Sequence, residues 1–187
     1  MSKENNMEYL FNAVHYCMWH YEKESGRSLE RIINALFAPI QKYLFTKSFK
    51  EKYNKHLSKE QNDLNEYFYG CKNGLSIGNA SHDFGYFYSG YSIFLSFILI
   101  GIADRLWGNL HSLTVLLLFA LPVGLCYIPA YSAVFSNDRY LEYFKQFEKK
   151  DERWHKKWKR ITILFIIGSI VSTFMGIVAM WAIEHLL

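Results

Sequence analysis

The stretch Phe84–Asn137 decides the fold, and it reads FGYFYSGYSIFLSFILIGIADRLWGNLHSLTVLLLFALPVGLCYIPAYSAVFSN. Its only formally charged residues are the adjacent pair Asp104 and Arg105. They lie between an uncharged run of 20 residues, Phe84–Ala103, and one of 32, Leu106–Asn137. Because an α-helix rises about 1.5 Å per residue, 20 residues span the roughly 30 Å hydrocarbon core of a bilayer. The stretch therefore predicts a membrane hairpin with a short polar turn at Asp104–Ser112.

A third uncharged run, Ile161–Ile183, has 23 residues and predicts a third span. The predicted fold class is an all-α membrane protein with an N-terminal cytoplasmic helical domain and three transmembrane helices. We expect four segments: an amphipathic helical domain at 1–83, the transmembrane hairpin at 84–137, a basic cytoplasmic helix at 138–160 and the C-terminal transmembrane helix at 161–187.

The first 83 residues are polar enough to form helices outside the lipid. Met7–Glu24 predicts a helix that Gly26 ends, and Ser28 predicts the N-cap of the next one, which Pro39 should kink. The apolar positions of that second helix follow the i, i+3, i+4, i+7 rule: Leu29, Ile32, Ile33, Leu36, Phe37, Ile40, Tyr43 and Leu44. This face either packs on neighbouring helices or lies along the membrane surface. Beyond it we expect a helix at Lys59–Tyr69 and a long loop at Gly70–Asp83.

The spacing of basic residues predicts which side each segment occupies. The connection Asp138–Arg160 has nine Lys/Arg against five acidic residues, whereas the turn of the hairpin has only Arg105. The positive-inside rule therefore places this connection and the N-terminus in the cytoplasm. Three cysteines, Cys17, Cys71 and Cys126, are an odd number without paired spacing, so we expect no disulfide framework.

Small and hydroxylated residues recur in the first and third spans. Gly168, Ser172 and Gly176 form a doubled small-xxx-small pattern that predicts helix packing. A ring of subunits could turn the hydroxyl groups of these spans toward water. The candidates for lining such a pore are Ser89, Ser92, Ser96, Ser169, Ser172 and Thr173.

A basic and aromatic segment precedes the third span, and it predicts membrane anchoring rather than nucleic-acid binding. Its residues are Arg153, Trp154, His155, Trp158 and Arg160. Cys17 and His20 share a helix face, but a metal site needs three or four ligands, so we expect neither a metal nor a cofactor.

Arg105-Leu-Trp-Gly-Asn-Leu-His111 matches the Arg-x(4–6)-His signature of HEPN-type RNases. With its short chain, membrane spans and basic helical region, the protein resembles the small membrane accessory proteins of type VI-B CRISPR loci. The resemblance implies a homo-oligomeric pore in the inner membrane that strengthens RNA-guided antiviral defence by depolarising the cell, with an RNA-guided nuclease system as partner. The predicted topology places Arg105 and His111 on the outer side of the membrane, where they could not reach cytoplasmic RNA. We therefore predict that the signature is non-catalytic and that the protein is not an enzyme.

The leading hypothesis is a homo-oligomeric membrane pore that permeabilises the inner membrane, with the bilayer and further copies of the chain as partners. The first alternative is a membrane-tethered scaffold whose N-terminal helices recruit a cytoplasmic partner. The second alternative is an RNase of the HEPN type that uses Arg105 and His111.

Overall fold

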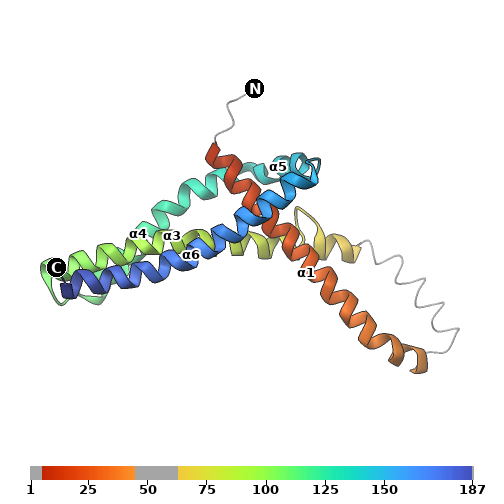
Figure 1. Ribbon diagram of the computed structural model, residues 1–187, viewed down its shortest axis with the longest axis horizontal. Coiled ribbons are helices and arrows are strands. Elements are labelled where there is room, and N and C mark those ends of the chain that lie inside the picture. The colour runs from red at the N-terminus through yellow and green to blue at the C-terminus, as the bar shows by residue number, and fades with distance from the viewer. Residues whose placement is uncertain (1–5, 45–62, 187) are drawn as a thin grey trace. The chain divides into compact units, whose positions relative to one another are not determined.

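The computed structural model describes residues 6–44 and 63–186, with side chains at 6–37 and 63–185, and these ranges are helical without a strand (Figure 1). Residues 63–69 form a short helix. The longer elements are α1 (Asn6–Leu44), α3 (Leu75–Trp107), α4 (Ser112–Val134), the 3-10 turn η1 (Ser136–Asp138), α5 (Arg139–Phe147) and α6 (Glu152–Leu186).

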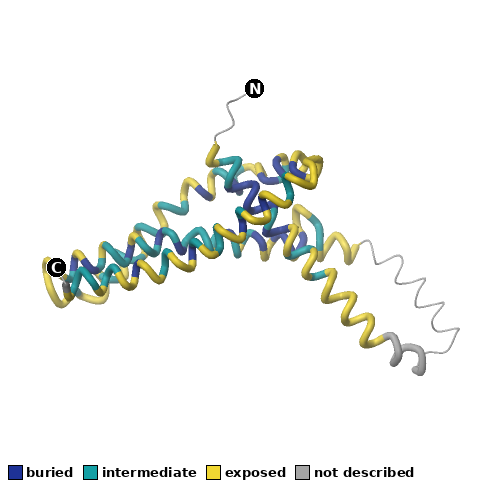
Figure 2. The backbone as a smooth tube through the Cα atoms, in the orientation of Figure 1, coloured by how far each residue is buried: buried dark blue, intermediate teal, exposed yellow. Residues whose placement is uncertain are grey.

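Within the described ranges, three helical stretches are long and apolar enough to cross a membrane: Leu75–Trp107, Ser112–Phe147 and Glu152–His185. The membrane hairpin and the third span are thus confirmed as helices of sufficient length. Along α3, α4 and α6 only scattered positions are buried, and many large apolar side chains face outward (Figure 2). This distribution suits a lipid environment, because leucine and isoleucine side chains that are exposed to lipid carry no hydrophobic penalty.

The chain divides into two compact units, which are described separately. The membrane unit comprises Met1–Cys17 and His82–Leu187, and the N-terminal unit comprises Met18–Ser81. The long helices α1 and α3 each contribute residues to both units.

Within the membrane unit, α3 runs parallel to α6 and antiparallel to α4. The Phe84 ring stacks on Phe165 with centroids 6.3 Å apart, and further along both helices the Thr173 hydroxyl donates to the carbonyl of Gly90 at 3.3 Å. On the other side, the hydroxyls of Tyr88 and Ser96 donate to the carbonyls of Cys126 and Phe119, so the numbers of α4 fall as those of α3 rise. The first and third apolar runs therefore begin at the same end of the bundle.

An aromatic cap closes that end of the bundle. We use this name for the packed rings of Tyr9, Phe11, His15, Tyr16, Phe84, Tyr88, Phe135, Tyr140, Tyr143, Phe144, Phe147, Trp154 and Trp158. They come from the first turns of α1, the 84–88 part of α3, the segment after α4, α5 and the first turns of α6. Edge-to-face ring pairs of this kind contribute about 0.5–1.5 kcal/mol each beyond their burial. The cap therefore fixes the first turns of α1 to the bundle.

The chain reverses direction immediately after α4 to bring α5 into the cap. Asn137 and Asp138 both adopt the left-handed conformation, with φ of 58° and 55°, which these two residue types tolerate best after glycine. Asn12 Nδ2 donates a 3.0 Å hydrogen bond to the carbonyl of Ala133 near the end of α4. This bond satisfies one of the carbonyls that a helix C-terminus leaves without an intrahelical donor.

In the N-terminal unit, the expected break at Gly26 is wrong, because α1 continues from Asn6 to Leu44. A helical glycine costs only about 1 kcal/mol, and at Gly26 its missing side chain admits the Tyr69 ring, whose Cε1 lies 3.1 Å from where a Cβ would be. Ser28 is not an N-cap; its hydroxyl donates to the carbonyl of Glu24 inside the helix. Tyr69 is held further by a 3.2 Å hydrogen bond from its hydroxyl to Glu30.

The expected loop at Gly70–Asp83 is also wrong for most of its length, since α3 begins at Leu75 and only 70–74 connect the helices. Ile77, Ala80 and Phe84 are all buried, and their helical spacing continues the apolar pattern of the first span backward. Of the expected helix Lys59–Tyr69, the described part, 63–69, is helical. The first residues of that expected helix lie outside the described residues.

The basic connection does not form one helix that runs into the third span. α5 ends at Phe147 and α6 begins at Glu152. Asp151 is the N-cap of α6, and its side chain accepts a 3.1 Å hydrogen bond from the backbone N–H of Trp154. The break lets Phe147 stack on Trp154 with centroids 4.8 Å apart. Packing of the aromatic residues of α5 against those at the beginning of α6 favours the turn over a continuous helix.

Candidate functional site

The small residues of the third span face α3 of the same chain. A Cβ on Gly90 would overlap the Ser169 hydroxyl and lie 3.2 Å from the Thr173 hydroxyl, and a Cβ on Gly101 would lie 3.1 Å from the Cα of Met180. A Cβ on Gly176 would lie 3.0 Å from the Cα of Phe94, and Gly168 is covered by the Tyr91 side chain. We call these contacts the glycine seam. They let two backbones approach closely, which is how small residues hold membrane helices together.

The candidate pore-lining hydroxyls lie inside or beside this packing. Ser92, Ser96 and Ser169 are only 3%, 0% and 3% exposed, while Ser89, Ser172 and Thr173 are half-buried. The hydroxyl of Ser96 donates to Phe119 of α4 at 2.9 Å. Thr173 bridges α6 to α3 through Gly90. In this single chain the hydroxyls of Ser89, Ser96 and Thr173 therefore donate to backbone carbonyls, and Ser92 and Ser169 are buried.

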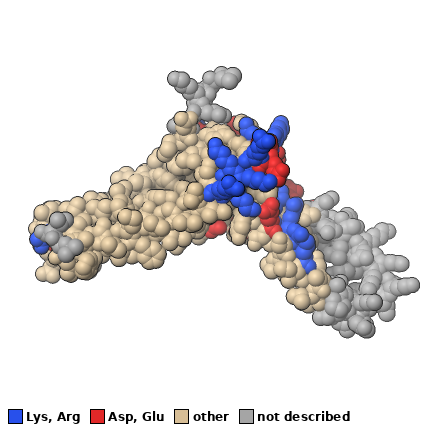
Figure 3. Space-filling model, viewed as in Figure 1, with Lys and Arg blue, Asp and Glu red and all other residues tan. Residues whose placement is uncertain are grey.

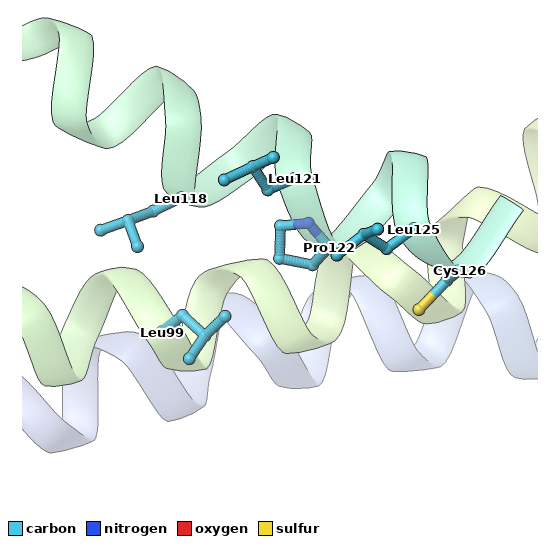
Figure 4. Close-up of a pocket in the computed structure, with 6 residues that line it drawn as sticks. All are labelled: Leu99, Leu118, Leu121, Pro122, Leu125 and Cys126. Atoms are coloured by element: carbon cyan, nitrogen blue, oxygen red, sulfur yellow. The ribbon is translucent and has the colours of Figure 1, made fainter. Parts of the chain in front are cut away.

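The outward faces of the spans are apolar, and a groove between two of them is apolar as well. A groove of about 340 Å³ lies between α3 and α4 and is lined by Leu99, Leu118, Leu121, Pro122, Leu125 and Cys126 (Figure 4). Pro122 lies inside α4, where it removes one backbone donor from the helix. A groove without polar lining at membrane depth offers a ligand no directional contact.

The Arg105 and His111 pair occupies the turn between α3 and α4. Arg105 is exposed in the last turn of α3, where a positive charge complements the helix dipole. His111 is the N-cap of α4, and its Nδ1 accepts a 3.3 Å hydrogen bond from the backbone of Leu113. Both residues thus have ordinary helix-terminus roles in the described structure.

The predicted anchoring residues separate into two groups. Trp154 and Trp158 turn into the aromatic cap, and Trp154 Nε1 donates a 3.0 Å hydrogen bond to the hydroxyl of Tyr9. His155 packs beside Trp154 and Tyr16. Arg153 and Arg160 are exposed on the other side of α6. Trp154 and Trp158 thus pack inside the protein, whereas Arg153 and Arg160 remain exposed on its surface.

The cap encloses two polar side chains that the sequence patterns did not single out, Asn12 and His15. Both have no exposed surface, and burial lowers the pKa of His15 from 6.5 to about 3. His15 is surrounded by the rings of Phe84, Phe135, Tyr140 and Phe144. Burial also raises the pKa of the Cys17 thiol to about 11, so this cysteine is a protonated thiol at neutral pH. In the sequence, the feature that indicates the burial of Asn12 and His15 is the position of two polar residues, three apart, on an otherwise aromatic face of α1.

Exposed Lys and Arg side chains gather over α5 and the first turns of α6, while the faces of the spans in the same view have few charges (Figure 3). The exposed basic residues of this region are Arg139, Lys145, Lys149, Lys150, Arg153, Lys156, Lys157, Lys159 and Arg160.

An exposed apolar face lies on α1 in the N-terminal unit. Leu29, Ile32, Ile33, Leu36 and Phe37 are 59%, 57%, 44%, 66% and 52% exposed. Their spacing places them within one arc of the helix, whereas Arg31 and Asn34 lie on the opposite arc. Such a stripe outside a membrane span marks an interaction surface.

Among the residues that the structure describes, no three His, Cys, Asp or Glu side chains come close enough to hold a metal ion. The chain matches no family model, no curated protein and no solved structure.

Proposed function

We propose that this protein is a membrane-anchored interaction module whose α1 helix recruits a cytoplasmic protein partner. The exposed apolar face of α1, from Leu29 to Phe37, is the observation that carries the proposal. Three spans hold the chain in the bilayer, and the aromatic cap ties the beginning of α1 to those spans. The positive-inside pattern supports a position of α1 on the cytoplasmic side of the inner membrane.

The apolar face of α1 contributes favourable free energy to recruitment. Burying a large aliphatic or aromatic side chain contributes about 1.5–3 kcal/mol, and each of the five residues still has roughly half of its surface to bury. The face therefore offers about 4–8 kcal/mol before the costs of association. That range suits a reversible helix-in-groove or helix-on-helix contact.

Charge favours a protein partner over the lipid surface. Along the stripe Leu29–Phe37 the helix has one acidic residue, Glu30, and one basic residue, Arg31. Surface-lying amphipathic helices are enriched in Lys and Arg on their polar face, because the cytoplasmic leaflet is anionic. A balanced polar face gains no such attraction.

The test is site-specific photo-crosslinking in intact cells. A photoreactive residue at Leu36, on the apolar face, should give one discrete protein adduct, and the matched probe at Asn34, on the opposite face, should not. In the purified adduct pair, Ile32→Ser with Leu36→Ser should weaken binding at least tenfold, and Asn34→Ser should leave it unchanged. Lipid-only adducts at Leu36, or equal adducts at both positions, would refute recruitment through this face.

The homo-oligomeric pore stays a prediction, and it has its own test. Among its candidate lining hydroxyls, Ser96 joins α3 to α4 and Thr173 joins α6 to α3 within one chain, so opening a polar path through them would require these helices to separate. The reconstituted protein should then release a dye from liposomes and depolarise expressing cells. An adduct at Leu36 of twice the chain mass would favour self-assembly over a separate partner.

The link to an RNA-guided nuclease and antiviral defence also stays a prediction, as does the RNase alternative. Cysteine labelling of the 108–111 turn from outside intact cells decides the latter. Labelling there would leave Arg105 and His111 without access to cytoplasmic RNA.

A further inference from the structure

The basic residues at the beginning of α6 occupy one side of the helix. At 100° per residue, Arg153, Lys156, Lys157 and Arg160 fall within an arc of about 100°. Trp154 and Trp158 lie on the opposite side, inside the aromatic cap. All four basic side chains are exposed. We call them the basic arc.

The same side of α6 continues into the span as an exposed apolar stripe. Leu164, Ile167, Val171, Phe174 and Val178 are 67%, 50%, 49%, 65% and 63% exposed. They follow the basic arc at spacings of three, four or seven residues, so they lie directly below it on the helix. In a membrane this stripe contacts the acyl chains of the lipids, and the basic arc beyond it contacts the layer that borders those chains.

The height of the arc matches the layer of lipid headgroups. The uncharged run begins at Ile161, so Arg160, Lys157 and Arg153 lie about 1.5, 6 and 12 Å beyond it along the helix. The polar layer on each side of the hydrocarbon core is about 5–8 Å thick. Long basic side chains also extend several ångströms toward this polar layer. Arg160 and Lys157 therefore lie at phosphate level, and Arg153 lies at its outer edge.

Three of the four charges are available for binding. Lys156 Nζ lies 2.8 Å from the Glu152 carboxylate, whereas Arg153, Lys157 and Arg160 form no ion pair with any described residue. The Asp151 cap and the Trp154 bond to Tyr9 fix the orientation of this part of α6. A fixed, unpaired cationic side at headgroup level is complementary to phosphate.

We propose that the basic arc of α6 binds the phosphate groups of anionic phospholipids in the surrounding bilayer. The bound lipid places its headgroup at Lys157 and Arg160 and its acyl chains along the stripe that begins at Leu164. This surface is separate from the apolar face of α1, and it does not depend on the function proposed for that face.

The experiment titrates the full-length protein in neutral detergent with fluorescent phosphatidylglycerol, with fluorescent phosphatidylcholine as reference. Lys157→Gln with Arg160→Gln removes two charges from the arc. Lys149→Gln with Lys150→Gln removes two charges from the 148–151 connection, further from the span, and is the matched control. Lys157→Arg with Arg160→Lys keeps both charges and controls for packing.

A basic residue near an anionic surface strengthens binding about fivefold, so the arc pair should weaken phosphatidylglycerol binding by about 25-fold. The control pair should change it less than threefold, and the charge-retaining pair should keep wild-type affinity. Phosphatidylcholine binding should be equal in all variants. Equal losses in both charge-removing pairs, or none in either, would overturn the proposal. Unchanged lipid binding with loss of a single-stranded RNA probe would overturn it too and assign the arc to RNA.

Discussion

Gly176 in the glycine seam offers the sharpest test of the packing between α3 and α6. Gly176→Ala would place a Cβ 3.0 Å from the Cα of Phe94 and 2.9 Å from the Cδ2 of Phe97. The Phe97 ring can turn away, but the Phe94 Cα belongs to the backbone. Carbon atoms pack at about 3.5–4.0 Å, so the two helices must separate by roughly 0.5–1 Å.

Overpacking of this size costs about 1–3 kcal/mol in free energy of unfolding. At about 2–4 °C per kcal/mol for a chain of this length, the midpoint of thermal unfolding should fall by about 2–12 °C. Tryptophan fluorescence in detergent follows the transition, because Trp154 and Trp158 lie in the cap at the end of the same bundle.

Gly124→Ala is the matched control. Gly124 lies in α4, and a Cβ there would meet no atom within 4 Å. This substitution should leave stability unchanged or raise it by about 0.5–1 kcal/mol through helix propensity. A Gly176→Ala protein that melts like wild type, or a Gly124→Ala protein that loses as much as Gly176→Ala, would refute the seam. Changed particle mass with an unchanged midpoint would instead place Gly176 between copies of the chain.

Three further predictions concern the cap and the bundle. Because the pKa of His15 falls from 6.5 to about 3 on folding, only the unfolded chain binds its proton between these values. Stability should be full above pH 6.5 and fall by up to about 1.4 kcal/mol per unit below it, and His15→Phe should flatten this slope in pH-dependent melts. Tyr9→Phe removes the acceptor of the Trp154 indole and should cost about 0.5–1.5 kcal/mol in the same assay; wild-type stability would contradict that bond. Ser96→Ala removes the bond to Phe119 and should cost about 0.6 kcal/mol, with the exposed Ser132→Ala as the neutral control.

Three helices long and apolar enough to span a bilayer were predictable from the sequence alone. Uncharged runs such as Ile161–Ile183 are too long for ordinary core helices, and a bilayer requires each span to satisfy its own backbone. The presence of three spanning helices and the hairpin follows from that requirement. So does the helical character of the exposed face at Leu29–Phe37, because its apolar period is 3.6 residues.

Tertiary structure alone decided what those helices contact. The spacing of Gly168 and Gly176 is the same whether the facing helix belongs to this chain or to another copy, and only the fold places α3 there. Trp154 has the sequence context of an interface anchor, yet a break at 148–151 turns it onto Phe147. Gly26 remains helical because Tyr69, distant in sequence, packs on it. Local pattern determines which surfaces avoid water, and long-range packing determines which surface covers which.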